Sequence, residues 1–222
     1  MNKQLLYIIL LLFFFSRNAY CQQTQLKEKE LYSSDFIIDG YTRPFTYYMP
    51  QHYGEKLKYP LLIFLHDINK TGRQLIKNYG DIIHSKADSA SAIIIYPDAV
   101  DGRWNVTDDT AHKGSSPVND VSFLSIIIDY FVQQHNADEK RIYVAGINNG
   151  AAMAYRLSCS HPLKIAAIAP LDLRHDYAEA ICKNATPVAV MDTKKLLPQT
   201  PFKFDQTSVD EIFSFFMAHP KK

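Results

Sequence analysis

Residues 141–157 contain the arrangement of residue types in this sequence that could most readily carry out a reaction. An apolar, β-branched segment runs into Gly146-Ile147-Asn148-Asn149-Gly150 and then directly into a run of strong helix formers. A strand, a sharp turn and a helix in this order can present the central residue of the turn as a nucleophile, with glycines where the strand and the helix approach closely. The central residue is Asn148, and asparagine tolerates the positive φ that such a turn requires. A carboxamide is not a useful nucleophile at neutral pH, so we expect Asn148 to preserve the turn without the chemistry.

A second group of candidates lies at the end of the same predicted helix. Ser158, Ser160 and His161 are close in sequence there, and Ser122 opens the preceding predicted helix. A serine beside a histidine can form a catalytic dyad. The same pattern is also typical of a helix C-terminus whose hydroxyls bond the backbone. Both interpretations remain open from the sequence.

The sequence predicts no metal site and no cofactor. Its eight histidines show no His-x-x-x-His or His-Glu-x-x-His spacing, and Asp108-Asp109 lacks the further spaced oxygens of a calcium site. Asp172 and His175 follow a predicted strand, where ligands of α/β proteins bind, so both are cleft candidates, with a solvated loop as the alternative. Trp104 is a candidate for an aromatic ligand surface, although most aromatic residues are expected in the core.

The composition restricts the class of protein. The chain has 222 residues, of which 47% are hydrophobic, and its 24 Lys and Arg residues balance 23 Asp and Glu residues. The apolar content and the mixed charge argue against intrinsic disorder. A net charge of +1 provides no field for nucleic acid, so no nucleic-acid partner is expected. The length suits one domain, and no oligomeric state is predicted.

The N-terminal residues have the pattern of a targeting segment. An unbroken apolar run of eleven residues, Leu5–Phe15, follows Lys3, and spanning a bilayer takes about 20 such residues. Ala19-Tyr20-Cys21 resembles a signal-peptide cleavage site. We therefore predict a signal peptide at 1–21, a polar lead-in at 22–34 and a single domain at 35–222. The protein is then secreted or periplasmic and leaves the membrane after cleavage. A retained N-terminal helix and lipidation of Cys21 are the alternatives.

Two cysteines, Cys159 and Cys182, remain after such a cleavage. An even pair in an oxidising compartment indicates a disulfide, with two buried free thiols as the alternative. Closing a loop of this length would stabilise the fold by roughly 3 kcal/mol. Neither cysteine is expected to be catalytic, because no histidine or cationic motif beside it would lower the thiol pKa.

The strands that must position these residues are apolar and evenly distributed. Phe36–Ile38 and Phe45–Met49 form a predicted hairpin with Asp39-Gly40 at its turn. The later predicted strands are continuous apolar runs, as in a parallel sheet covered on both faces, at 60–66, 92–96, 141–145, 165–169 and 187–191.

Helical patterns separate these strands. One is predicted over 121–131 with Asn119 or Asp120 as its cap, a second over 151–157, and a third over 208–217 with Ser208 as its cap. The alternation of strands and helices predicts an α/β domain with a mostly parallel sheet.

Several of these stretches together resemble the secreted esterase group of polyhydroxybutyrate depolymerases and feruloyl esterases. The resemblance is carried by residues 39–50, 60–66, 96–98, 104–105, 119–123, 146–154 and 165–170, and the Cys159 and Cys182 pair fits it as well. It implies an α/β-hydrolase fold, with a mostly parallel sheet flanked by helices, and activity on carboxylic esters. The implied partner is a small ester, polyester or carbohydrate-linked ligand, in a cleft that includes His66, Asp98 and Trp104.

The sequence departs from that family at the catalytic positions. Asn148 replaces the family's nucleophilic serine, and the family's Leu-His-Gly reads Leu65-His66-Asp67. Asp67 and Asn149 occupy the positions of the oxyanion hole, where an anionic Asp67 would oppose the developing charge. The family's Gly-x-x-Asp turn reads Asp192-Thr-Lys-Lys here.

The catalytic histidine of the family has no counterpart either. No histidine lies between Met191 and the last predicted helix, and His219 falls in the tail that follows that helix. We therefore expect the C-terminal part of the sheet to be shortened. Loss of nucleophile or base alone can lower turnover by about a millionfold. The prediction is a catalytically inactive, ligand-binding esterase-like protein, and the alternative is an active carboxylic-ester hydrolase with relocated catalytic residues.

Overall fold

The computed structural model describes residues 31–106, 118–173, 188–192 and 205–221, and it is built around one seven-stranded sheet in the order β1-β2-β4-β3-β5-β6-β7. β1 and β2 form an antiparallel hairpin, β2 is antiparallel to β4, and the pairings from β4 through β3, β5 and β6 to β7 are parallel. The prediction of a mostly parallel α/β sheet is confirmed. The strands are β1 (Leu31–Ile38), β2 (Tyr41–Tyr48), β3 (Tyr59–Leu65), β4 (Ile93–Pro97), β5 (Ala137–Ile147), β6 (Ala167–Leu171) and β7 (Ala189–Val190).

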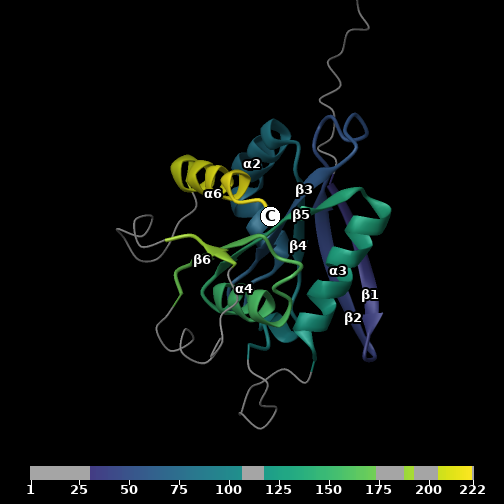
Figure 1. Cartoon of the computed structure of the whole chain (residues 1–222). Coiled ribbons are helices and arrows are strands. Elements are labelled where there is room, and N and C mark those ends of the chain that lie inside the picture. Colours follow the sequence, from purple (N-terminus) through teal and green to yellow (C-terminus); the bar gives the residue numbers. More distant parts are fainter. Residues whose placement is uncertain (1–30, 107–117, 174–187, 193–204, 222) are drawn as a thin grey trace, which may run out of the picture.

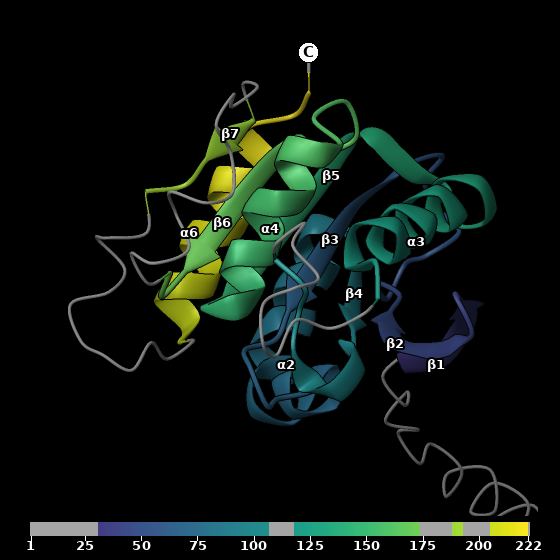
Figure 2. The same ribbon diagram turned by 90° about the horizontal axis from the view of Figure 1, so that it is seen from below.

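Helices cover both faces of this sheet. α3 (Asp120–Gln134) and α4 (Asn149–Ser160) pack on one face, and α2 (Gly72–Ala90) and α6 (Gln206–Ala218) pack on the other, as Figures 1 and 2 show. The side chains of β3 alternate between the two layers, as the pleat of a strand requires. Leu61, Ile63 and Leu65 belong to the core under α3 and α4, whereas Leu62 and Phe64 belong to the core under α2 and α6.

Two element boundaries differ from those predicted. β1 begins at Leu31, five residues before the predicted strand at Phe36–Ile38. α6 is capped by Asp205, whose side chain accepts a hydrogen bond from the Ser208 N–H at 2.8 Å. Ser208 is therefore not the cap but its partner in a capping box, because its hydroxyl accepts the Asp205 N–H at 2.9 Å.

Helix α2 is absent from the sequence-based prediction. Its start is defined by another capping box, in which the Thr71 hydroxyl accepts the Gln74 N–H at 3.2 Å and the Gln74 side chain accepts the Thr71 N–H at 3.0 Å. Its buried side is formed by Leu75, Ile83 and Ala87. The helix begins very close to β4, since a Cβ on Gly72 would lie 2.6 Å from the Tyr96 carbonyl oxygen.

The carboxyl ends of β3, β5 and β6 meet at one edge of the sheet. Leu65 pairs with Gly146, and Ile147 pairs with Leu171. The residues that follow these strands are thereby placed at the same edge, as is usual for ligand sites in parallel sheets. The predicted shortening of the sheet concerns residues 193–204, which lie outside the described part of the chain.

Candidate functional site

The turn between β5 and α4 has the conformation that the sequence predicts. Asn148 adopts φ 48° and ψ −103°, outside the regions that most residues occupy. Its N–H donates to the Leu171 carbonyl at 2.8 Å, and its carbonyl accepts the Ala152 N–H at 3.0 Å. We call residues 146–150 the elbow. These two hydrogen bonds fix the elbow to β6 on one side and to the first turn of α4 on the other.

The two glycines of the elbow are required by close backbone approach. A Cβ on Gly146 would lie 2.2 Å from the Gly150 carbonyl oxygen. A Cβ on Gly150 would lie 2.5 Å from the Leu65 oxygen and 2.7 Å from the His66 oxygen. Contacts this short with backbone atoms cannot be relieved by moving a side chain. The elbow is therefore compatible only with glycine at both positions.

The side chain of Asn148 sits in a buried position without a defined partner. The residue is 8% exposed, and its Oδ1 atom is buried with no hydrogen-bond partner. Although Asn148 is the N-cap residue of α4, its side chain makes no capping hydrogen bond. The position that would hold a nucleophilic hydroxyl in an esterase thus holds a neutral carboxamide, which lacks a nucleophilic atom at neutral pH.

His66 lies beside this edge in a fully buried, fixed setting. Its Nδ1 bonds the Asp67 carbonyl at 2.7 Å, and its Nε2 bonds the Ala99 N–H at 3.1 Å. Since an N–H can only donate, Nε2 is the acceptor and Nδ1 carries the proton. Burial lowers the pKa of His66 below its usual 6.5. Both ring nitrogens are occupied, so His66 holds two loops together and is not available as a base.

Asn149 of the elbow forms a buried pair with Trp104. The Trp104 N–H donates to Asn149 Oδ1 at 2.8 Å, and Asn149 Nδ2 donates to the Trp104 carbonyl at 3.2 Å. The Trp104 indole donates to the His66 carbonyl at 3.0 Å. Both residues are 1% exposed. Trp104, predicted to line a cleft, is therefore part of the core, and the Asn149 side chain supports a loop. The Asn149 N–H, at the first position of α4, still has no acceptor within the helix.

Asp98, predicted for the cleft, and Asp67, predicted for the oxyanion hole, both accept backbone hydrogen bonds. Asp98 accepts the Gly72 N–H at 2.5 Å and so stabilises the start of α2. Asp67 accepts the Ile68 N–H at 2.6 Å. Asp172 follows β6 directly, is half-buried and has φ 49°. His175 and Cys182 lie outside the described residues, so the cleft role of His175 and the bridge from Cys159 to Cys182 remain predictions.

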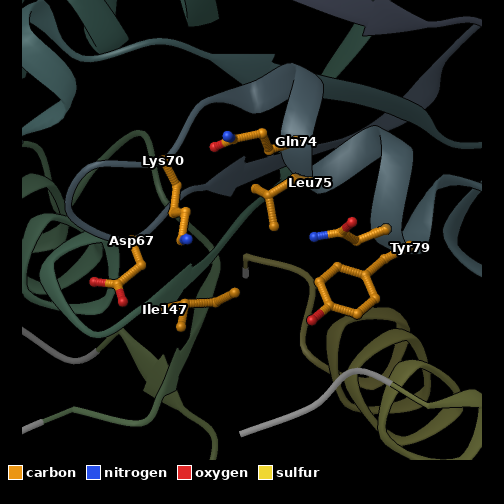
Figure 3. Close-up of a pocket in the computed structure, with 7 residues that line it drawn as sticks. Asp67, Lys70, Gln74, Leu75, Tyr79 and Ile147 are labelled. Carbon is orange, nitrogen blue, oxygen red and sulfur yellow. The ribbon is translucent and has the colours of Figure 1, made fainter. Parts of the chain in front are cut away.

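A pocket of about 150 Å³ adjoins the elbow on the side of α2. Figure 3 shows Lys70 and Leu75 pointing toward Ile147, the residue before Asn148. Asp67 adds a carboxylate at one end. The lining of the pocket therefore combines apolar side chains with polar groups that can orient a small ligand. The lining residues are Asp67, Lys70, Gln74, Leu75, Asn78, Tyr79 and Ile147.

A buried ionic network, not identified from the sequence, holds the loop that carries Trp104. Arg43 of β2 forms an ion pair with Asp120, and its guanidinium lies 4.0 Å from the centre of the Phe123 ring. Asp120 also accepts the Asn105 N–H at 2.6 Å, and Arg156 of α4 donates to the Asn105 carbonyl at 2.9 Å. Burial raises the pKa of Asp120, although Asn105 and Arg43 both act to lower it. The signal available in the sequence was a lone arginine within a strand pattern.

Comparison with known proteins identifies the family of this chain. A family model described as "Esterase PHB depolymerase" matches residues 44–194, which is more than half of the chain. The chain belongs to this esterase family. The matched residues include strands β3 to β7 and the elbow.

Related proteins of known name are esterases that share part of their length with this chain. Feruloyl esterase D of Neurospora crassa is 25% identical over 141 residues, which cover 60% of this chain and 46% of that protein. Acetylxylan esterase A of Emericella nidulans is 31% identical over 85 residues, which cover 36% and 27%. The chain thus spans less than half the length of these relatives. A solved structure described as a thermostable esterase superposes with a TM-score of 0.61 at 15% identity, covering 86% of this chain and 64% of that one, which supports the fold alone.

Of the alternative nucleophiles in this esterase-family chain, Ser158 has its hydroxyl bonded within α4, and Ser160 is exposed at the end of that helix. The Ser158 hydroxyl donates to the Tyr155 carbonyl at 2.8 Å and is 5% exposed. His161 is the C-cap residue of α4, and burial lowers its pKa. Ser122 lies in the first turn of α3, where its N–H is capped by Asn119 at 3.0 Å. Within the described residues, no hydrogen bond joins Ser122, Ser158 or Ser160 to a histidine.

The other histidines that the structure describes also have neighbours of their own. His52 pairs with Glu55, His84 stacks on the Tyr48 ring at 4.0 Å, and His135 packs on the Phe131 ring at 4.8 Å. His219 bonds the Phe215 carbonyl at 2.7 Å. Among the described residues there is no group of three or more His, Cys, Asp or Glu side chains that could hold a metal. In the same part of the chain, no helix is both long and apolar enough to cross a membrane.

Proposed function

We propose that this protein is a secreted member of the esterase family that does not hydrolyse esters and instead binds a ligand at the edge of the sheet beside the elbow. The proposal rests on the conformation and chemistry of Asn148. Its backbone has the strained conformation expected of a nucleophile at this turn, but its side chain is a carboxamide. The contacts of the described histidines are with backbone groups, rings and a glutamate, and none is with a serine hydroxyl. Loss of nucleophile or base alone can lower turnover by about a millionfold, so the missing groups together leave no route to hydrolysis.

The ligand proposed is a small ester, polyester fragment or carbohydrate-linked ester, bound in the pocket between α2 and Ile147. Lys70 and Asp67 offer opposite charges, and Leu75 and Ile147 offer apolar surface. Suitable probes are methyl ferulate and an acetylated xylo-oligosaccharide, because the related proteins are named as feruloyl and acetylxylan esterases. Binding of either probe, measured by calorimetry, should weaken about tenfold or more when Lys70→Ala removes the cation, a loss of ~1.4 kcal/mol.

Hydrolysis is tested with p-nitrophenyl acetate and p-nitrophenyl butyrate. The purified protein should release no more nitrophenol than a heat-denatured sample. Asn148→Ser should remain equally inactive, because a serine without a base and an acid is not activated. Restored turnover in that variant would show that a base reaches the elbow, with His175→Ala as the variant that tests the candidate.

An active hydrolase with relocated residues makes the opposite prediction. Turnover by the unmodified protein that disappears in Ser158→Ala or Ser160→Ala would replace the proposed binding function with catalysis. Secretion is tested separately, by expressing the full chain with its own N-terminus in a bacterial host. The exported protein should begin at Gln22.

A further inference from the structure

The backbone at Asn148 places the following nitrogen close to its own side chain. In a helix ψ is about −42° and in a strand about +135°, and in both cases the next nitrogen lies well away from Cβ. At the ψ of −103° found here, the even spacing of the substituents on a tetrahedral Cα makes the Asn149 nitrogen nearly eclipse Cβ of Asn148. That is the arrangement required to close a five-membered ring from the Asn149 nitrogen to the Asn148 Cγ.

The groups that would form this ring are available. The Asn149 N–H is the first of α4 and has no acceptor within the helix. The positive end of the helix favours the negative charge that develops as this nitrogen loses its proton. The Asn148 carboxamide is not held by a capping hydrogen bond, and its Oδ1 has no partner. The backbone hydrogen bonds that join Asn148 to Leu171 and to Ala152 hold its N–H and its carbonyl in place.

We propose that Asn148 is a site of spontaneous deamidation in the folded protein. The Asn149 nitrogen attacks Cγ of Asn148, the new N–Cγ bond forms, and the Cγ–Nδ2 bond breaks. The proton of the Asn149 N–H leaves with the amide nitrogen as ammonia. Water then adds to the cyclic imide, and opening of the N–Cγ bond gives aspartate, whereas opening of the backbone bond gives isoaspartate. No group is oxidised or reduced.

The neighbouring residue provides an internal comparison. Asn149 is followed by Gly150, which has no side chain to hinder ring closure, so in an unfolded chain Asn149 is the more reactive asparagine. In the fold, however, the Asn149 carboxamide is fixed by two hydrogen bonds to the Trp104 backbone and is 1% exposed. Asn149 is also part of a helix, whose ψ keeps the Gly150 nitrogen away from its side chain. In the folded protein, Asn148 should therefore deamidate faster than Asn149, the reverse of the order in the unfolded chain.

The modification has a defined electrostatic result. It replaces a neutral residue in the elbow with a carboxylate at the N-terminus of α4, where negative charge is favourable. An aspartate at this position can also accept a hydrogen bond from the first turn, which the asparagine does not do here. Isoaspartate instead inserts a methylene into the backbone of a turn that has no spare room around Gly146 and Gly150.

The test follows deamidation in the folded protein and in urea. Both samples are incubated at mildly alkaline pH and digested with trypsin, and the peptide Ile142–Arg156, which contains both asparagines, is fragmented by mass spectrometry to locate the change. In the folded sample we expect Asn148 to react faster than Asn149 and than the exposed Asn136 by about tenfold, which corresponds to ~1.4 kcal/mol of barrier. In urea, Asn149 should react first.

Two results would overturn this inference. One is faster reaction at Asn149 than at Asn148 in the folded sample, and the other is an Asn148 rate no higher than that of Asn136. Asn148→Gln is the matched variant, because its longer side chain cannot form the five-membered ring, and its peptide should stay unmodified while the protein is folded. The comparison of folded and unfolded wild-type protein decides the question even where that variant fails to fold. Neither measurement depends on whether the protein hydrolyses esters.

Discussion

The side chain of Asn149 forms two hydrogen bonds with the backbone of Trp104, at 2.8 Å to the N–H and at 3.2 Å to the carbonyl. This pairing joins the first residue of α4, which belongs to the elbow, to the loop after β4. It shows why a residue whose backbone was predicted for an oxyanion hole has a side chain devoted to structure. It also brings the Trp104 indole within bonding distance of the His66 carbonyl.

Asn149→Ala should destabilise the protein by about 2–4 kcal/mol. The substitution leaves the buried Trp104 N–H and carbonyl without partners, and each such loss costs about 1–3 kcal/mol. The free energy of unfolding in urea, monitored by the fluorescence of Trp104, measures the effect. Asn149→Asp keeps the acceptor and should lose less. Asn78→Ala, on the exposed side of α2, should change stability by no more than a few tenths of a kcal/mol. A similar loss in both alanine variants would contradict the role of the Trp104 contact.

Gly150→Ala should be among the most damaging single methyl additions in the chain. The new Cβ would lie 2.5 Å from the Leu65 oxygen, so either the β3 backbone or the elbow must move. We expect a loss of about 3 kcal/mol or more, the upper end of the range for overpacking. Gly80→Ala is the matched control, because its Cβ meets a flexible Ile76 methyl at 3.2 Å and the change gains about 1 kcal/mol of helix propensity. Equal losses in the two variants would argue against the close packing of the elbow.

The parts of the fold that could be predicted from the sequence are those with a short-range signal. β3 and β4 are continuous apolar runs, and the elbow is marked by Gly146 and Gly150 within five residues. Helix α2 has a weaker signal because it is exposed along much of its length, with Arg73, Gln74, Lys77 and Asn78 between its buried positions. Its capping box, Thr71 and Gln74, was nevertheless present in the sequence.

The roles of individual site residues depend on long-range contacts that the sequence does not contain. His66 is a structural residue because its imidazole bonds Ala99, 33 positions later in the chain. Asp98 bonds Gly72 across 26 positions. Both lie in loops that follow strands, where sequence patterns favour ligand binding. Only the folded arrangement shows that these groups are satisfied by the backbone.

Removing one partner of the buried ion pair should lower the free energy of unfolding more than removing both partners. Asp120→Leu leaves the Arg43 guanidinium buried without its carboxylate, and such a change typically costs about 3–5 kcal/mol. The double variant Arg43→Met with Asp120→Leu removes both charges from the same space. It should be more stable than the Asp120→Leu single variant, since both lose the Asn105 N–H contact but only the single variant keeps a buried charge. Urea unfolding of the two single variants and the double variant gives the coupling energy, and additive losses would show that the pair is not coupled.

The stability of the protein should fall as the pH drops below 6.5, and His66 should account for part of that fall. Burial lowers the pKa of His66 in the folded state from its usual 6.5, so below this pH the unfolded chain binds a proton that the folded chain does not. Its contribution to stability is therefore lost from pH 6.5 downward until the folded-state pKa is passed.

His66→Gln retains a donor and an acceptor but cannot titrate. The variant should be less stable at neutral pH, and its free energy of unfolding should depend less steeply on pH between neutrality and pH 5. Asn149→Ala, which lowers stability without removing a titrating group, should keep the slope of the unmodified protein. If the two variants share one slope, His66 is not a source of the acid sensitivity, and His135 and His161, whose pKa values burial also lowers, become the residues to substitute next.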